Sequence, residues 1–394
     1  MNKDLFEILK LMQNNINKIN NYEILGLEDL KGRILAQNIK ALKNLPSFDN
    51  SALDGYAFKF KDKNNPIYIK GTIFAGDKND YSINDNECYK IMTGAKMPLN
   101  SDTIIRLEEA EIKDKYLFIN NYIKENDGHR KKGEELSIGD DLLQNGKVLN
   151  ASDLMMVASQ GIYKLKVLRK IKIAIFSSGD ELVEPWQNAD ENSIYNANAI
   201  AIYNLLKNDL CDISYLGIIK DDLKLTKLAF DNNDFDLIIS SGGASVGEAD
   251  YMSEALKELD FVELFDHITT KPAKPTKLYK KNNQLVLILP GNPLSAFLSC
   301  LLIGKSIIKL LCGLNIDFKY EKAFFSGKLK IKNKRNNLIL GQIKNNHFIV
   351  TNNNQNGSGM IRPLLQSSHL LISDFDQSEF NDMDEIKALK IDDI

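Results

Sequence analysis

Residues 171–182 spell IKIAIFSSGDEL, a largely apolar run that ends in two serines, a glycine and two acids. A short run rich in β-branched residues predicts a buried strand, and the polar residues after it predict a turn. Similar runs follow at 213–219, 235–240 and 284–289, and helical patterns at 198–207, 223–230 and 251–259 lie between or beside them. This alternation predicts a doubly wound α/β domain over 171–315, with its chemistry in the loops after the strand carboxyl ends.

The flanking sequence predicts three further parts. Residues 1–45 show two stretches of apolar residues at helical spacing, one from Leu5 onward and one over 27–39. A helix over 153–160, with Ser152 as its N-cap, is expected to rejoin them. Short apolar runs separated by turns predict an inserted β-rich domain and, after the α/β domain, a small barrel or sandwich. The expected architecture is therefore multidomain α/β and β: a helical linker domain (1–45 plus 146–170), an inserted β-rich domain (46–145), the doubly wound α/β domain (171–315) and a C-terminal β-barrel (316–394).

Charge and composition exclude several classes of protein. The 394 residues carry 50 Lys and Arg against 53 Asp and Glu, a formal net charge of -3, which gives no electrostatic reason to expect nucleic acid as a partner. The four cysteines form no CxxC pair and the four histidines show no metal-ligand spacing. Charges near the N-terminus argue against export, and the apolar runs are too interrupted for a membrane span. These features favour a protein of the cytoplasm.

Four loops at strand ends of the α/β domain are unusually rich in acids or glycine. They are 177–181, 221–222, 240–250 and 290–293. The glycines of the third loop free backbone amides for a phosphate, although an ordinary tight turn also explains them. Four acids would repel one another in one crevice unless a cation such as Mg²⁺ held them, although helix caps and solvated loops explain them equally well. These acids are Glu181, Asp221, Asp222 and Asp250.

A basic loop and three segments of the inserted domain add further candidates. Two prolines in KPAKP, residues 271–275, hold Lys271 and Lys274 on extended backbone, where they could meet an oxyanion or remain solvated surface lysines. Residues 48–57, FDNSALDGYA, and 91–95, IMTGA, combine acids, turn glycines and a hydroxyl, although an Asx turn also explains the first. A basic run at 130–132 precedes two acids and could be a solvated hairpin tip.

Taken together, eight segments resemble the MoeA family of molybdopterin molybdenumtransferases, which is related to the E domain of gephyrin. In order they are FDNSALDGYA, IMTGA, KKGEEL, FSSGDEL, GIIKDD, SSGGASVGEADY, KPAKP and LPGNP. Each segment is modest alone, and their shared order makes the resemblance specific.

The resemblance implies an enzyme that inserts molybdate into adenylylated molybdopterin and releases AMP, with Mg²⁺ as cofactor and an α/β domain similar to molybdopterin adenylyltransferases. It also implies an elongated homodimer whose cleft combines the α/β domain of one subunit with the inserted domain of the other. Molybdopterin adenylyltransferase and molybdoenzyme apoproteins would be partners. Two alternatives from other classes are a non-catalytic scaffold like the gephyrin E domain and a molybdopterin adenylyltransferase.

The resemblance also assigns site residues by motif. The catalytic candidates are Asp54, Thr93, Glu135, Glu181 and Asp250, and the metal candidates are Glu181, Asp221, Asp222 and Asp250. The substrate-binding candidates are Ser241, Gly242, Gly243, Ser245, Gly247, Lys271, Lys274, Pro290, Pro293 and Ser358.

Three positions depart from the family pattern. The family usually has aspartate in place of Glu135, and glycine in place of Ala273, where a positive φ would strain an alanine. His267 stands where the family has a lysine, which would make that charge dependent on pH.

Overall fold

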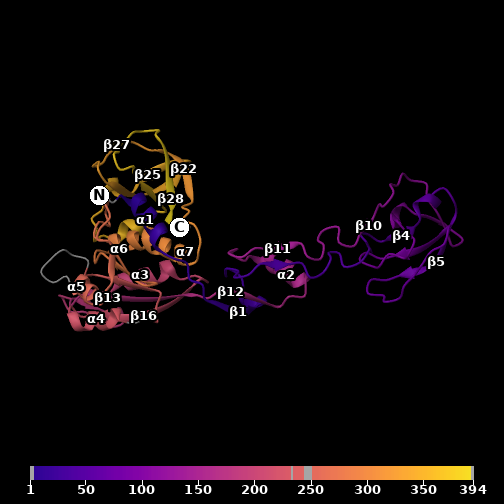
Figure 1. Ribbon diagram of the computed structural model, residues 1–394. Helices are drawn as coiled ribbons and strands as arrows, with labels where there is room; N and C mark the ends of the chain where they lie inside the picture. Colours follow the sequence, from indigo (N-terminus) through magenta and orange to yellow (C-terminus); the bar gives the residue numbers. More distant parts are fainter. Residues whose placement is uncertain (1–3, 232–233, 244–250, 392–394) are drawn as a thin grey trace. The chain divides into compact units, whose positions relative to one another are not determined.

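The structure is a computed structural model that describes residues 4–231, 234–243 and 251–391. Its contacts divide the chain into two compact units. The core unit comprises Met1–Ile24, Lys31–Ala36 and Lys166–Ile394, and the inserted unit comprises Leu25–Leu30 and Gln37–Leu165. Figure 1 labels the elements of both.

The α/β part of the core unit is built on a six-stranded sheet in the order β16-β13-β17-β21-β20-β18. The parallel strands are β13 (Ile171–Ser178), β16 (Cys211–Ile219), β17 (Leu237–Ser241) and β21 (Gln284–Leu289), and the antiparallel strands are β20 (Lys277–Lys281) and β18 (Val262–Phe265). The four strands predicted from the sequence are confirmed, with small shifts at their ends. Their carboxyl ends therefore lie at one edge of the sheet, as a doubly wound fold requires.

Helices cover both faces of this sheet. Ile173 and Ile175 of β13 belong to a core cluster with α1 (Leu5–Asn15), α3 (Ala197–Leu206), α6 (Pro293–Ser299) and α7 (Lys305–Leu311). Ala174 and Phe176 belong to a second cluster with α4 (Leu223–Phe230) and α5 (Tyr251–Glu258). Because successive strand residues face opposite ways, both faces are apolar, and the predicted doubly wound architecture is confirmed.

The run from Pro293 to Leu311 consists of α6, a π-helical turn (Cys300–Gly304) and α7. It is long and apolar enough to cross a membrane by length and composition alone, but 78% of that window is buried within the protein. Its leucines and isoleucines belong to the main core cluster, which is the packing of a central core helix.

The expectation of a helix over 27–39 is wrong. That segment contains a 3₁₀ turn (Leu27–Asp29), followed after Gly32 by extended chain and β2 (Ile39–Lys40). Gly32 has a φ of +78°, which a continuous helix cannot accommodate. β1 (Tyr22–Gly26) pairs with β12 (Lys164–Leu168), and β2 pairs with β11 (Asp141–Leu143).

The helix expected after residue 150 is present as α2 (Ala151–Ser159), but its N-cap is Asn150 rather than Ser152. The Asn150 side chain accepts from the backbone N–H of Asp153, and the Asp153 carboxylate accepts from the backbone N–H of Asn150. α1 falls in the core unit and α2 in the inserted unit, so the expected helical linker domain is not one of the two compact units.

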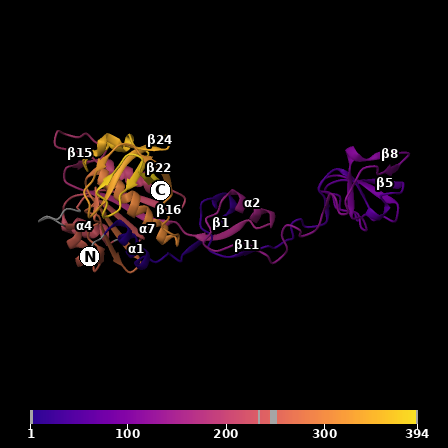
Figure 2. The same ribbon diagram turned by 90° about the horizontal axis from the view of Figure 1, so that it is seen from above.

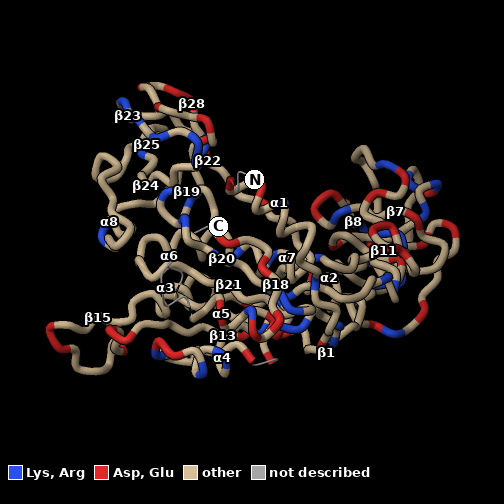
Figure 3. The backbone as a smooth tube through the Cα atoms, turned by 60° about the vertical axis from the view of Figure 1, so that its left-hand side comes forward, with Lys and Arg blue, Asp and Glu red and all other residues tan. Residues whose placement is uncertain are grey.

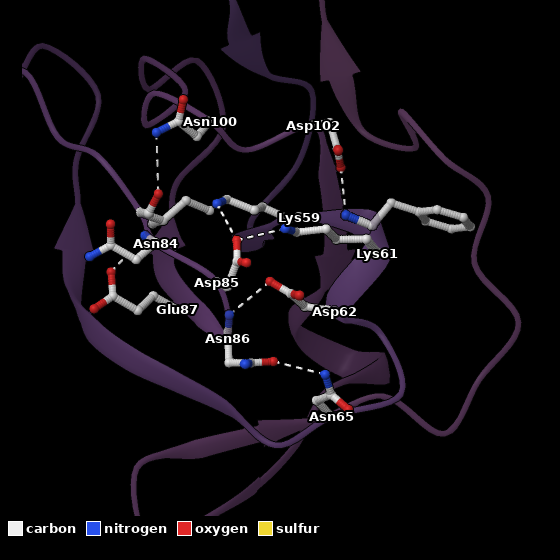
Figure 4. A network of polar contacts seen from close by, with 12 residues as sticks. Lys59, Lys61, Asp62, Asn65, Asn84, Asp85, Asn86, Glu87, Asn100 and Asp102 are labelled. Carbon is white, nitrogen blue, oxygen red and sulfur yellow. Dashed lines mark hydrogen bonds and ion pairs between the residues drawn. The ribbon is translucent and has the colours of Figure 1, made fainter.

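The inserted unit contains the expected β-rich fold, a six-stranded sheet in the order β7-β4-β6-β5-β9-β8. The strands are β4 (Gly55–Phe58), β5 (Ile67–Ile73), β6 (Glu87–Ile91), β7 (Thr103–Arg106), β8 (Glu111–Lys113) and β9 (Tyr116–Phe118). Polar contacts hold the adjoining turns, as Figure 4 shows: the ammonium groups of Lys59 and Lys61 each lie 2.7 Å from Asp85 Oδ1, and Asp62 Oδ2 accepts from the backbone N–H of Asn86 at 2.8 Å.

The C-terminal part of the core unit is a closed five-stranded barrel, which confirms the predicted barrel. Around it the strands pair in the order β24-β25-β22-β28-β26 and back to β24. They are β22 (Tyr320–Phe325), β24 (Asn336–Lys344), β25 (His347–Val350), β26 (His369–Ile372) and β28 (Glu385–Lys390), drawn in orange to yellow in Figure 2. β19 (Thr270–Lys271) pairs in parallel with β24, which ties the start of the basic loop to the barrel.

Candidate functional site

The two adjacent aspartates after β16 have different hydrogen-bond partners. Asp221 Oδ1 accepts from the hydroxyl of Ser178, the last residue of β13, at 2.6 Å. Asp222 is the N-cap of α4, and its Oδ1 accepts from the backbone N–H of Leu225 at 2.8 Å. Asp221 is thus held at the carboxyl edge of the sheet, whereas Asp222 satisfies a helix terminus.

Gly242 and Gly243, after β17, have positive φ angles and close neighbours that disfavour a larger residue. Gly242 has a φ of +103°, and a Cβ there would lie 2.3 Å from the carbonyl oxygen of Ser178. Gly243 has a φ of +68°, and its Cβ would lie 2.4 Å from Cγ of Met252. The backbone N–H of Gly242 donates to the carbonyl of Leu289 at 3.2 Å. The ends of β13, β17 and β21 therefore meet at this turn, as the topology predicts.

Asn198 of α3 is a site residue that sequence reasoning missed. Its side-chain amide donates to the hydroxyl of Ser241 and to the carbonyl of Gly291, both at 2.8 Å. It therefore joins the turn of Gly242 and Gly243, which we call the glycine turn, to the LPGNP turn. The signal was available as the Asn-Ala-Asn triplet at the start of α3, because the first asparagine, Asn196, is the buried N-cap of that helix.

We call the carboxylates that follow β13 and β16, those of Glu181, Asp221 and Asp222, the acidic edge. Glu181 is exposed, and its carbonyl accepts from the backbone N–H of Ile194 at 2.8 Å, next to the pairing of β14 (Leu182–Val183) with β15 (Ile194–Tyr195). Ser245, Gly247 and Asp250 lie outside the described residues. Within the described residues, no group of three or more His, Cys, Asp or Glu side chains is arranged to hold a metal ion.

The buried hydroxyl groups of Thr276 and Ser299 support the conformation of the basic loop, residues 271–275. Ala273 is buried with a φ of +82°, which confirms the strained conformation anticipated where the family has glycine. The hydroxyl of Thr276 donates to the carbonyl of Ala273 at 2.8 Å and lies 2.7 Å from the hydroxyl of Ser299 on α6. The carbonyl of Lys274 accepts from two backbone N–H groups, those of Ile268 and Thr276, at 2.9 Å each. His267 Nδ1 lies 2.8 Å from Asp266 Oδ1.

Lys271 lines a cavity of about 190 Å³ between the basic loop and the barrel, together with three further cations that sequence reasoning missed. They are Lys330, Lys332 and Arg335. No acidic side chain is among the residues that line this cavity. The run KLKIKNKR at 328–335, with five cations in eight residues, could have identified them from the sequence. Figure 3 shows Lys and Arg of this region in blue near β23 (Leu329–Lys330). We call this cavity the basic pocket.

Arg335 is the least exposed cation of the pocket. Its Nε donates to Asn337 Oδ1 at 3.1 Å, and burial lowers the pKa of its guanidinium. Lys274 is not among the residues that line the pocket, although it belongs to the same loop as Lys271.

The LPGNP turn meets the barrel through Ser358. Pro293 occupies the first turn of α6, where its missing N–H costs nothing. The next residue, Leu294, donates its backbone N–H to the carbonyl of Ser358 at 3.0 Å and also lines the basic pocket. Pro290 is buried, and its carbonyl lies 3.5 Å from the Ser241 hydroxyl. The acidic edge, the glycine turn and the basic pocket are thus linked through residues 289–294.

Three motifs meet within the inserted unit. Asp54 Oδ1 accepts from the backbone N–H of Thr93 at 2.7 Å and from the Thr93 hydroxyl at 2.8 Å. Both hydrogen bonds lower the pKa of Asp54, and the bond from the backbone N–H has the larger effect. In the same segment, β3 (Asn50–Ser51) pairs with β10 (His129–Arg130), and Asp49 Oδ1 accepts from the backbone N–H of Lys132 at 2.7 Å. Glu135 Oε2 lies 3.4 Å from Arg130 Nη2. Asp54 and Thr93 are thus bonded directly, whereas Glu135 is linked to their segment through Arg130 and the pairing of β10 with β3.

Comparison with known proteins agrees with these motifs. Residues 4–161 match the MoeA N-terminal region (domain I and II), and residues 174–309 match a probable molybdopterin binding domain. The molybdopterin molybdenumtransferase of Haemophilus influenzae is 34% identical over 296 residues, which cover 74% of this chain and 73% of that protein. That of a Nostoc species is 30% identical over 337 residues, which cover 82% and 77%.

A MoeA protein of molybdopterin biosynthesis from Pyrococcus horikoshii shares the fold, with a TM-score of 0.86 at 23% identity over 99% of both chains. The similarity to curated relatives extends over both units, and the motifs that it covers are those assembled at the sheet edge and in the inserted unit. The chain therefore belongs to the MoeA family of molybdopterin molybdenumtransferases, transferases of molybdenum cofactor biosynthesis.

Proposed function

We propose that this transferase inserts molybdate into adenylylated molybdopterin and releases AMP. The observation that carries the proposal is the link, within one unit, between a glycine turn suited to phosphate and a pocket lined by four cations and no acid. The glycine turn suits the pyrophosphate group whose bond must be cleaved. The basic pocket suits molybdate, the oxyanion that must be inserted.

The glycine turn supplies the phosphate side of the site. The Ser241 hydroxyl accepts from Asn198 and faces the Pro290 carbonyl, so it is used to position the turn. The N–H of Gly242 donates to the Leu289 carbonyl, which leaves the Gly243 amide as the group of the described turn that would meet a phosphate. Backbone N–H groups at such a turn stabilise negative charge on phosphate oxygens without side-chain ordering.

The donor set fits Mg²⁺ held jointly by protein and substrate. Mg²⁺ is usually bound by one or two carboxylates together with substrate phosphates rather than by a complete protein cage. Asp221 and Glu181 would hold it on the protein side, because Asp221 lies against Ser178 at the end of β13, whereas Asp222 caps α4. When bound, the ion would neutralise charge on the phosphate that leaves as AMP. Ser178 orients Asp221 by donating to Oδ1.

The basic pocket suits a small tetrahedral oxyanion. Its volume of about 190 Å³ is below the ~300–1,000 Å³ typical of pockets for drug-sized ligands, so it fits molybdate better than a pterin nucleotide. Arg335 and Lys271 would hold the anion, since Arg335 is fixed by Asn337 and Lys271 by the pairing of β19 with β24.

The inserted unit supplies further groups. The bonds from Thr93 lower the pKa of Asp54 and fix the position of its carboxylate, whose negative charge would orient the substrate. The resemblance to the family extends the proposal to a homodimer in the cytoplasm, supplied by an adenylyltransferase and discharging its product to molybdoenzyme apoproteins.

The decisive experiment incubates the protein with adenylylated molybdopterin, Mg²⁺ and molybdate, and measures AMP. We expect AMP release that requires molybdate. ATP consumption with unmodified molybdopterin would instead indicate an adenylyltransferase, and neither reaction would indicate a scaffold.

A matched pair of variants tests the role of the inserted unit. Asp54→Asn retains an oxygen for Thr93 but removes the charge, and we expect AMP release to fall about a hundredfold, the scale of a lost electrostatic contact in an active site. Asp85→Asn removes an exposed charge that pairs with Lys59 and Lys61 in the same unit, and we expect it to retain wild-type turnover. Equal rates for both variants would remove Asp54 from the site.

A further inference from the structure

Four lysines occupy alternate positions along the run 328–334, and the structure divides them into two pairs. The outer pair is neutralised: Lys328 Nζ lies 3.3 Å from Glu379 Oε2, and Lys334 Nζ lies 2.6 Å from Asp376 Oδ1. The inner pair, Lys330 and Lys332, lines the basic pocket. Among the described residues, neither inner ammonium group takes part in an ion pair.

The inner lysines differ from the other two cations of the pocket. Arg335 is half-buried and donates to Asn337, and Lys271 is the last residue of β19, which pairs with β24, although its side chain is exposed. Lys330 and Lys332 are exposed as well, and only Lys330 belongs to a paired strand, β23, so that each carries a solvated charge on a flexible stem. Such charges beside a cavity raise the local concentration of an oppositely charged ligand, and salt screens their effect. They are poorly suited to fixing the ligand's orientation, because ordering a lysine side chain costs entropy.

We infer that Lys330 and Lys332 form a capture pair, which draws the oxyanion into the basic pocket where Lys271 and Arg335 hold it. This inference rests on the proposed function and assigns to the two lysines a role in substrate entry. Lys328 and Lys334 each have an acidic partner, Glu379 and Asp376, so that among the described residues the two lysines of the run without an ion pair are those that line the pocket.

The test compares two double variants with the same change in net charge, Lys330→Ala/Lys332→Ala and Lys328→Ala/Lys334→Ala. The rate of AMP release is measured against molybdate concentration at low salt and at about 0.3 M salt. For the inner variant we expect kcat/KM for molybdate to fall about tenfold at low salt, kcat to stay the same, and the difference to shrink at high salt. For the outer variant we expect values close to wild type.

Two results would overturn the inference: an equal loss of kcat/KM in the outer variant, or a loss in the inner variant that appears in kcat and ignores salt. Binding of inorganic tungstate, measured by calorimetry on the same proteins, separates this inference from the proposed function. If the wild type releases no AMP, the proposed function fails. The capture pair is still supported in that case if the inner variant alone binds tungstate more weakly than the wild type at low salt and the difference shrinks at high salt. Equal tungstate affinity in all three proteins at low salt would contradict it.

Discussion

The acidic edge of the sheet and the basic pocket lie in one unit, but the partners of their charged side chains differ. Asp221 and Asp222 each accept a hydrogen bond from a neutral donor, Ser178 in one case and a helix N–H in the other. The cations of the basic pocket meet no acid among the side chains that line it. Satisfied carboxylates can serve the fold as well as a ligand, whereas cations gathered around a cavity without an acid in its lining favour an anionic ligand there. The basic pocket is therefore the clearer mark of function.

The largest effect is expected at Asp221. Asp221→Asn keeps an oxygen that can accept from Ser178 but loses the charge, so AMP release should fall about a hundredfold with little change in thermal stability. Asp222→Asn is the matched control, because asparagine is an equally good N-cap. If both variants lose activity equally, the distinction between the two aspartates is incorrect.

The second largest effect is expected at Thr276, whose hydroxyl supports the basic loop. Thr276→Val keeps the side-chain shape but removes the hydroxyl bonded to the Ala273 carbonyl, leaving buried polar groups without a partner. We expect a loss of about 1–3 kcal/mol in the free energy of unfolding, measured in urea. Thr276→Ser should recover most of that loss. A double variant with Ser299→Ala should cost less than the sum of the two single changes, since both partners are then absent; strict additivity would argue against the contact.

A moderate effect is expected in the basic pocket. Arg335→Lys keeps the positive charge but loses the planar guanidinium that donates to Asn337 and could grip two oxygens of an anion. We expect KM for molybdate to rise about tenfold, which corresponds to roughly 1.4 kcal/mol, with kcat little changed. A wild-type KM would mean that only the charge of this residue matters.

The smallest effect concerns the other role of the acidic edge. Asp222→Ala removes the side-chain acceptor at the start of α4, and should lower the free energy of unfolding by about 1 kcal/mol while AMP release stays near the wild-type rate. Denaturation curves and rates measured on one preparation check both parts. Lost turnover with unchanged stability would instead assign Asp222 to the reaction.

Sequence patterns predicted most elements of the core unit because local chemistry determines them. The strand of residues 171–178 follows from its apolar run, and the turn at Gly242 follows from the need for a positive φ. Periodicity failed over 27–39, where the apolar spacing suits a helix but Gly32 adopts a left-handed conformation. One glycine in the middle of a short segment outweighed the pattern of its neighbours.

The candidate site, too, was predicted from the sequence only in part. Residue types and their order singled out the segments of Asp54, Asp221 and Lys271, and the resemblance to the family then made these residues site candidates. The partner of each group depended on the fold: Asp221 meets Ser178 from another strand, and Lys271 meets Arg335 across a cavity formed with the barrel. Such contacts join residues that are far apart in the chain, and no local periodicity encodes them.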